Sequence, residues 1–301
     1  MSTEDLVDDN IPRCANCDIK EDEGIKLKTC TSCKSVRYCG SKCQREHWPK
    51  HKKACKQRAA ELRDEILFKQ PEKSHLGDCP ICFLPHIDLK KSCMAICCSK
   101  TICDGCDIAN VRSGGPMMNK CLFCRSPKPK SQKEADRLMA KRVEANDPNA
   151  IREMGARRRR EENYKEAFVY FSKAAKLGSI QAHHDLVLLY NMGLGVEKDE
   201  KKMMYHLEQA AIGGHAEARH NLGTMAWENG KKEISIRHVI IASKQGHEKA
   251  IKDLKDVYAN TEGLISKADF ASALRGYQAA VDATKSDQRE EAEVALGAMR
   301  R

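Results

Sequence analysis

The sequence predicts two small cysteine-rich fingers of mixed α and β structure, followed by an all-α solenoid of helical repeats. Two observations predict this fold class. All sixteen cysteines of the 301 residues lie between Cys14 and Cys124, most of them in closely spaced pairs. Beyond them, a pattern of alanines, leucines and glycines recurs with a period of 32 to 36 residues, which is typical of stacked helix pairs.

The cysteines are interpreted as metal ligands and not as disulfides. The acidic start, Met1–Pro12, lacks the apolar segment of a secretory leader, and no stretch has the length of a membrane span. We therefore expect an intracellular protein, cytoplasmic or nuclear, whose thiols stay reduced. Two Cys-x-x-Cys pairs fill a tetrahedral zinc site. Four ligand pairs in each finger therefore predict four structural Zn²⁺ ions, two per finger.

The net charge of +10 raises the question of a nucleic-acid partner. Lysine is scattered through both halves of the chain, and aromatic residues make up only 5%, so a surface for stacking bases is not indicated. The one compact basic run, Arg157–Arg160, is interpreted as a solvated helix face. We expect protein partners, and neither nucleic acid nor membrane.

The first finger spans residues 14–55 and contains four ligand pairs, of which the last two have the i, i+4 spacing of one helical face. The pairs are Cys14/Cys17, Cys30/Cys33, Cys39/Cys43 and His51/Cys55. With Tyr38 before the third pair and His47-Trp48 before the fourth, this pattern resembles the MYND zinc finger. We expect Trp48 to fill the small core and His47 to be no ligand.

The resemblance to MYND fingers implies that the two zinc sites interleave. One site would use Cys14, Cys17, Cys39 and Cys43, and the other Cys30, Cys33, His51 and Cys55. It also implies that the finger binds short proline-containing segments, although a purely structural finger stays open as the alternative.

The second finger spans residues 79–125 and follows a helical linker, residues 56–78. Its pairs are Cys79/Cys82, Cys97/Cys98, Cys103/Cys106 and Cys121/Cys124. This order resembles a RING finger, which implies an outer site formed by the first and third pairs. The inner site would combine Cys121 and Cys124 with two of Cys93, Cys97 and Cys98, and His86 is a remoter candidate. Lys100 stands where the family has a histidine, so we expect Cys97 and Cys98; Cys93 with Cys98 remains the alternative.

The RING resemblance implies a role for two further residues. Ile81, inside the first knuckle, occupies the position that contacts a ubiquitin-conjugating enzyme, and Arg125, after the last cysteine, occupies that of the cation bridging this enzyme and ubiquitin. A RING finger has no side-chain nucleophile and acts by positioning the charged conjugating enzyme. In the alternative interpretation, Ile81 fills the core and Arg125 is merely exposed.

The body consists of a linker helix in residues 131–147, repeats in residues 148–284 and a charged C-terminal tail, residues 285–301, expected as helix or disorder. The repeated alanines are Ala150, Ala182, Ala218 and Ala250, each followed four residues later by methionine or leucine. These units resemble Sel1 repeats, a class related to tetratricopeptide repeats. Five histidines of the body are interpreted as solvated or capping residues and not as metal ligands: His183, His184, His215, His220 and His247.

No serine–histidine–acid set, phosphate-binding loop or open metal site is present in the sequence. Two function classes therefore remain. The first is a zinc-binding scaffold or adaptor whose RING-like finger is a candidate recruiter of a ubiquitin-conjugating enzyme, while the repeats bind a protein partner. The alternative is an active RING-type E3 ubiquitin ligase with the repeats as its substrate receptor.

Overall fold

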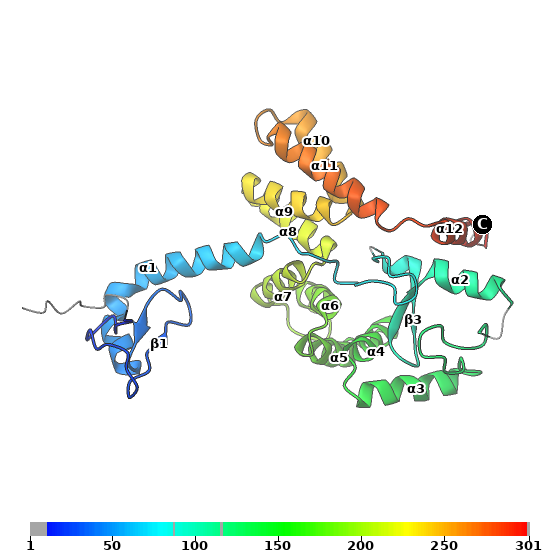
Figure 1. The fold of residues 1–301 in the computed structure, drawn as a ribbon, viewed down its shortest axis with the longest axis horizontal. Coiled ribbons are helices and arrows are strands. Elements are labelled where there is room, and N and C mark those ends of the chain that lie inside the picture. Colours follow the sequence, from blue (N-terminus) through cyan, green and yellow to red (C-terminus); the bar gives the residue numbers. More distant parts are fainter. Residues whose placement is uncertain (1–10, 87, 115–116, 300–301) are drawn as a thin grey trace, which may run out of the picture. The chain divides into compact units, whose positions relative to one another are not determined.

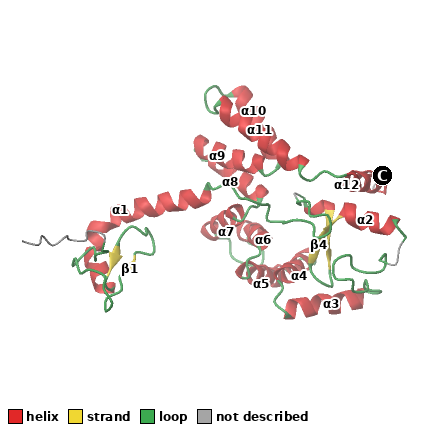
Figure 2. Cartoon of the chain, viewed as in Figure 1, coloured by secondary structure: helices red, strands yellow, loops and turns green. Residues whose placement is uncertain are grey.

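The computed structural model describes residues 11–86, 88–114 and 117–299. Residues 1–10 of the acidic start and residues 300–301 of the expected tail lie outside this range. The chain divides into two compact units, residues 1–69 and 70–301. Small fingers with few strands are followed by a solenoid of helix pairs, so the predicted fold class is confirmed (Figures 1 and 2).

The first unit is built from a two-stranded sheet and one long helix. Strands β1 (Lys28–Thr29) and β2 (Arg37–Tyr38) pair antiparallel, with Lys28 opposite Tyr38. Helix α1 runs from Ser41 to Leu67, so the helix expected in the linker is the continuation of the finger's own helix. Among the described residues, the core contains cysteines and two other buried apolar side chains, Leu27 and Tyr38.

The second unit begins with the other finger. After the short 3₁₀ helix η1 (Leu89–Lys91), strands β3 (Ser92–Ala95) and β4 (Lys100–Cys103) form an antiparallel hairpin. Helix α2 (Asp104–Arg112) follows directly. Ile102 is the one buried non-cysteine side chain among the described residues of this core. Both fingers therefore lack the apolar interior that would hold a domain of this size together.

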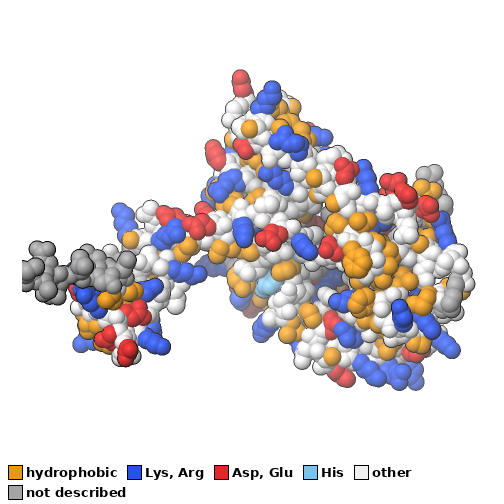
Figure 3. Space-filling model, in the orientation of Figure 1, with side chains coloured by type: hydrophobic (Ala, Val, Ile, Leu, Met, Phe, Trp, Pro, Cys, Tyr) orange, Lys and Arg blue, Asp and Glu red, His pale blue; other side chains and the backbone are white. Residues whose placement is uncertain are grey.

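Helix α3 (Gln132–Glu144) connects the second finger to the repeats. Ser131 caps it by accepting a hydrogen bond from the Glu134 amide, and Met139 is buried beneath it. Lysine and arginine side chains gather over the outer side of this helix (Figure 3). A buried stripe under a solvated basic face is the ordinary arrangement of a surface helix.

The repeat body consists of four helix pairs in which each pair packs on the next (Figure 1). The helices are α4 (Pro148–Arg160) with α5 (Tyr164–Lys176), α6 (Ile180–Met192) with α7 (Glu200–Ile212), α8 (Ala216–Glu228) with α9 (Lys232–Lys244), and α10 (Glu248–Asn260) with α11 (Lys267–Asp282).

The periodic residues of the body occupy the positions that the pattern predicts. The four opening alanines are fully buried, and Leu186, Leu222 and Leu254 fill the space between helices. Three turns between repeats end in glycines with positive φ: Gly178 (88°), Gly214 (90°) and Gly246 (83°). A left-handed residue at this place ends a helix at little steric cost only when it is glycine.

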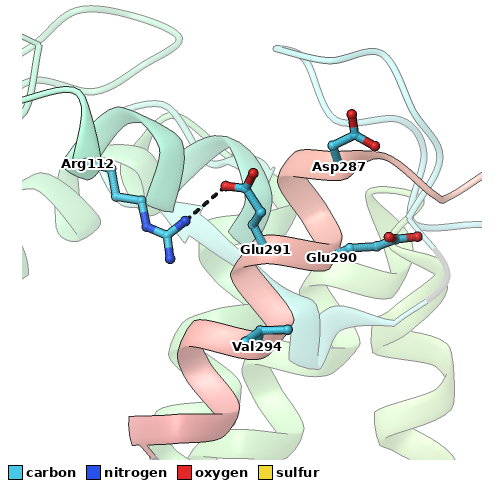
Figure 4. A pocket seen from close by; sticks show the side chains of 5 residues that line it. All are labelled: Arg112, Asp287, Glu290, Glu291 and Val294. Atoms are coloured by element: carbon cyan, nitrogen blue, oxygen red, sulfur yellow. Dashed lines mark hydrogen bonds and ion pairs between the residues drawn. The ribbon is translucent and has the colours of Figure 1, made fainter.

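The last helix, α12 (Asp287–Met299), packs on α2 of the second finger. Arg112 of α2 pairs with Glu291 at 3.0 Å across a shallow depression between the two helices (Figure 4). Lys91 pairs with Glu293 at 2.9 Å. The stretch expected as a charged tail therefore contributes a helix to the second finger. Within the described ranges, no helix has both the length and the apolar character needed to cross a bilayer.

Candidate metal centres

The structure gathers the predicted ligands into four clusters. In each cluster the ligand atoms lie within 4.8 Å of one another. The clusters are Cys14, Cys17, Cys39 and Cys43; Cys30, Cys33, His51 and Cys55; Cys79, Cys82, Cys103 and Cys106; and Cys97, Cys98, Cys121 and Cys124. In both fingers the first pair therefore meets the third, and the second meets the fourth, which is the interleaved order expected from the sequence.

The spacing of the donor atoms fits a tetrahedral zinc ion. With zinc–sulfur bonds of about 2.3 Å, two ligand sulfurs of one tetrahedron lie about 3.8 Å apart. In the first finger the Sγ atoms of Cys30 and Cys55 are 3.8 Å apart, and Cys33 Sγ is 3.3 Å from His51 Nε2. In the second finger, the sulfurs of Cys82 and Cys103 are 3.7 Å apart. Cysteine and histidine are also the donors that structural zinc sites use, so the residues fit this ion.

A repeated backbone turn explains why these pairs converge. In five knuckles, the residue after the second cysteine has a positive φ although it is not glycine: Asp18, Lys34, Phe83, Ser99 and Arg125. Its amide donates to the carbonyl four residues earlier, as in Lys34 to Cys30 (2.9 Å) and Arg125 to Cys121 (2.9 Å). This left-handed step closes the loop and directs both sulfurs to the same side. Such a conformation is costly for non-glycine residues and marks functional positions.

The same turn accounts for the adjacent pair Cys97 and Cys98. Here the Ser99 amide donates to Ala95 at 2.7 Å, so Ala95 occupies the place of a first cysteine and Cys98 that of the second. Cys97 supplies the missing donor from inside the turn, with its sulfur 3.3 Å from that of Cys124. Adjacent ligands are thus accommodated by a knuckle that lacks its usual first cysteine.

The two other candidates for the inner site lie outside the cluster. Cys93 is on β3 opposite Ile102, and its exposed thiol belongs to none of the four groups. Although the residue is exposed, partial desolvation of its sulfur, followed by the charges of Asp107 and Asp104, raises the pKa of Cys93 to about 11. His86 is buried, and burial together with the charge of Arg289 lowers the pKa of its imidazole.

Two serines influence the thiols of the clusters. Burial acts to raise the pKa of Cys33, but hydrogen bonds from Ser35, whose hydroxyl lies 3.0 Å from the sulfur, lower it to about 6. Burial also acts to raise the pKa of Cys124, but hydrogen bonds from the side chain and backbone of Ser126 outweigh this effect and lower the pKa to about 6. In contrast, burial and neighbouring sulfurs raise the pKa of Cys55 to about 12. One thiolate thus suppresses ionisation of the others, a repulsion that a bound dication relieves. Neither serine is among the residues predicted from the sequence, although both stand two residues after a knuckle cysteine.

The aromatic residues of the first finger differ in part from expectation. Tyr38 is 2% exposed and forms the core, whereas Trp48, expected there, is 42% exposed. The Tyr38 hydroxyl is within 3.1 Å of His47 Nδ1, and His47 belongs to no ligand cluster. Tyr38 occupies the core because it lies on β2 beside the cysteines, while Trp48 is on the outer side of α1.

A fifth group, His184, His215 and Glu217, also brings three donor atoms together. His215 caps α8, because its Nδ1 accepts a hydrogen bond from the Ala218 amide at 3.2 Å. The neutral ring then has its proton on Nε2 and no lone pair left for a metal. The His184 and His215 rings are stacked face to face, with centroids 4.1 Å apart. This group therefore does not fit a metal site, and His247 similarly caps α10.

The two residues singled out for partner binding differ in exposure. Ile81 is half-buried and packs against the cysteine core of the second finger. The Arg125 side chain is exposed, next to the knuckle that contains Phe123. Phe83 and Phe123 are 76% and 44% exposed, so the tips of two knuckles present aromatic rings to the outside.

The fold and the donor sets define a zinc-finger protein with a helical repeat body. Residues 14–55 match the family model of the MYND finger, so the first finger is a MYND finger. The chain is also 37% identical over 54 residues to the SET domain and MYND-type zinc finger protein 6 of Schizosaccharomyces pombe. These residues are 18% of this chain and 11% of that protein, so the chain spans about a tenth of the length of this curated relative.

Two solved structures are similar to part of the chain. A Sel1 repeat protein from Oxalobacter formigenes aligns with a TM-score of 0.43 and 27% identity, covering 59% of this chain and 73% of that one. A protective antigen of uropathogenic Escherichia coli strains aligns with a TM-score of 0.38 and 20% identity, covering 64% of this chain and 40% of the other.

Proposed function

We propose that the protein is a zinc-folded scaffold that joins protein partners, with four zinc ions as structural elements. In this proposal the MYND finger binds a short proline-containing segment, the repeat body binds a partner protein, and the second finger recruits a ubiquitin-conjugating enzyme. The observation that carries the proposal is that each cluster supplies four protein donors around one point. A four-coordinate zinc with four protein ligands has no position for water or substrate, so the fingers serve as docking surfaces.

Trp48 supports the assignment of peptide binding to the MYND finger. Its indole is 42% exposed and edge-on to the buried ligand His51, with ring centroids 6.4 Å apart. An exposed aromatic ring on a rigid helix suits a proline-containing segment, since such segments dock on aromatic side chains in extended form.

A panel of proline-containing peptides tests this part of the proposal. Trp48→Ala should weaken binding by tenfold or more, because exposed aromatic anchors dominate such interfaces. Ile66→Ala is the matched control, since Ile66 is an exposed apolar residue later on the same helix. If no peptide binds the intact chain, or if the two variants weaken binding equally, the finger has only a structural role.

An active E3 ubiquitin ligase is the second candidate function. It is favoured by the interleaved pairs of the second finger and by the exposed Arg125 directly after the last of them. Positioning of the conjugating enzyme is the whole of the expected catalysis, so the finger needs only a complementary surface.

Ubiquitin-chain formation with a panel of conjugating enzymes distinguishes the two functions. Arg125→Ala should lower the rate by roughly tenfold, equivalent to about 1.4 kcal/mol. Lys120→Ala is the control, because Lys120 is an exposed cation directly before the same cysteine pair. Absence of product with every conjugating enzyme would remove the ligase function and leave the scaffold.

A further inference from the structure

A short irregular segment of the second unit lies across the turn between α7 and α8. This segment, Pro71–His75, is called the strap here. A Cβ added to Gly214 would lie 2.7 Å from the Lys73 carbonyl oxygen and 3.5 Å from Pro71 Cβ. The strap therefore rests directly on the backbone of the turn, at a distance that only glycine permits.

The side chain of His75 forms the most specific contacts of the strap. Its Nε2 is 3.0 Å from Gln181 Oε1, and its Nδ1 is 3.3 Å from the Gly214 carbonyl oxygen. Its ring stacks on His215, with centroids 4.2 Å apart and an angle of 17° between the planes. His184 stacks on the same ring at 4.1 Å. The repeat surface thus recognises a backbone segment together with a planar side chain.

The strap contacts this repeat and not the equivalent turn one repeat earlier. Gly178 has the same left-handed conformation as Gly214, with φ of 88° against 90°. A Cβ added to Gly178 meets no described atom within 4 Å. Ser179 follows Gly178 where His215 follows Gly214, so the earlier turn has no ring for stacking. The strap contact and the ring therefore distinguish this turn from the preceding one, although Gly246 and His247 repeat the Gly-His pair at the next turn.

The site has hydrogen-bonding groups that the strap does not use. His215 is 4% exposed, and within the described part of the chain its Nε2 has no hydrogen-bond partner. Gln245 donates to the Gly214 carbonyl at 3.0 Å, while its own Oε1 is buried without a partner among the described residues. Unsatisfied buried groups cost roughly 1–3 kcal/mol each. A ligand that satisfied them would bind more tightly than the strap.

We propose that the turn between α7 and α8 is a binding site for a short, histidine-containing segment of a partner protein, which the strap occupies in cis as a replaceable ligand. This inference rests on the proposed function of the repeats as a partner-binding body and specifies the ligand and its place. The strap directly precedes the second finger in the sequence. Binding of the partner segment would therefore displace the strap and free the stretch of chain that links the MYND finger to the second finger.

The experiment uses a fluorescent peptide with the sequence of residues 70–78 and the full-length chain with Pro71→Gly and His75→Gly. Peptide is titrated to about 1 mM, because a short tether gives a cis ligand an effective concentration in that range. We expect binding to the double variant that is at least tenfold tighter than binding to the unaltered chain, whose site is mostly filled. A peptide with alanine in place of histidine should lose most of this affinity.

Two glycine variants in the same background separate a specific site from a folding effect. Gly214→Ala should abolish binding, whereas Gly178→Ala, with the same φ but open space around it, should retain it. Circular dichroism should show the same helix content in both. The proposal fails if the double variant shows no saturable binding, if the unaltered chain binds equally well, or if Gly214→Ala still binds. Such a failure would leave the results for Trp48 and Arg125 unaffected.

Discussion

Arg289 of α12 places its guanidinium Nη2 3.5 Å from the sulfur of Cys82, although the two residues are 207 positions apart in the sequence. The same guanidinium donates to the carbonyl oxygens of Leu84 (3.0 Å), Pro85 (2.9 Å) and Thr284 (3.1 Å). A cation beside a thiolate favours the ionised form that binds metal, and groups around the ligands commonly tune zinc affinity. The last helix is thus part of the surroundings of the outer site in the second finger.

Replacing Arg289 should therefore destabilise the second finger. Arg289→Ala removes the charged donor to the carbonyl oxygens of Pro85 and Thr284, and we expect a loss of about 2–3 kcal/mol in the free energy of unfolding of α12 and the finger. Hydrogen exchange of the α2 and β4 amides measures this loss. Arg112→Ala is the control, since the Arg112–Glu291 pair is more than half exposed on both sides and should contribute under about 1 kcal/mol. Equal effects of both substitutions would contradict a special role for Arg289.

The contact of α12 with α2 also depends on a glycine. A Cβ added to Gly105 would lie 2.9 Å from the backbone nitrogen of Arg289. Gly105→Ala should displace α12 at a cost of about 1–3 kcal/mol, visible as faster exchange of its amides. Gly297→Ala, on α12 itself with open space around it, should be neutral or stabilise the helix by up to about 1 kcal/mol. Unchanged exchange in Gly105→Ala would show that the two helices do not pack as described.

Cys97 and Cys93 should behave differently when each is replaced by serine. Cys97 lies in the inner cluster of the second finger, whereas Cys93 lies outside every cluster. Native mass spectrometry should therefore find three zinc ions in Cys97→Ser and four in Cys93→Ser. The Cys93 variant should also lose the reaction of the one thiol that remains free when zinc is bound. If Cys93→Ser instead lost an ion, the alternative ligand pair Cys93 and Cys98 would be correct.

The features that could be predicted from the sequence are those that depend on residues close together in the chain. Two donors three or four residues apart converge through a local turn, so the pairs could be identified without knowledge of the rest of the chain. The repeats could be predicted because Ala182, Ala218 and Ala250 recur at the same place in successive units and are all fully buried.

The parts that the sequence did not predict depend on packing between distant segments. Nothing near Arg289 indicates that it lies against Cys82, because that contact requires α12 to return to the second finger. His75 likewise stands in an unremarkable linker, and its partner His215 is 140 positions later. Trp48 is expected in the small core of the first finger, but Tyr38 occupies that place, and the sequence pattern alone does not decide between the two rings.

Docking of the strap should weaken as the pH falls. Burial lowers the pKa of His75, His184 and His215 in the docked state, and Arg152 adds to this effect. The hydrogen bonds of His75 to Gln181 and Gly214 oppose it at that ring, and the charges of Glu217 and Asp185 oppose it at His184, but burial outweighs them and the net direction is downward. The undocked state therefore binds more protons, so docking is strongest above the ordinary histidine pKa of about 6.5 and is lost progressively below it. Each histidine contributes at most about 1.4 kcal/mol per pH unit.

Hydrogen exchange of the strap amides between pH 7.5 and pH 5, corrected for the intrinsic pH dependence of exchange, measures this effect. His75→Phe keeps a planar ring but removes one titrating group, so protection should fall less steeply with pH in that variant. A steeper fall in His75→Phe, or protection that rises on acidification, would contradict the assigned sign. The helix content of the repeats should stay constant over the same range.

Removal of zinc should unfold the fingers and leave the repeats helical. In the first finger, only Leu27 and Tyr38 accompany the buried cysteines of the core, and in the second only Ile102 does so among the described residues. Zinc binding contributes roughly 10–16 kcal/mol to the folding of small finger peptides, far more than two or three buried side chains can supply. The last repeats have an apolar core of their own, with Ile251, Leu254 and Ala273 fully or almost fully buried. A chelator should therefore abolish protection in β1, β4 and α2, while α6 to α10 remain protected and most of the circular dichroism signal persists.

Native mass spectrometry before chelation should count four ions, and His184→Ala should leave that count unchanged, because the proton on His215 Nε2 excludes a fifth. Fewer than three ions, a fifth ion lost in His184→Ala, or simultaneous unfolding of the repeats would each contradict this division of the chain into metal-dependent fingers and a self-supporting body.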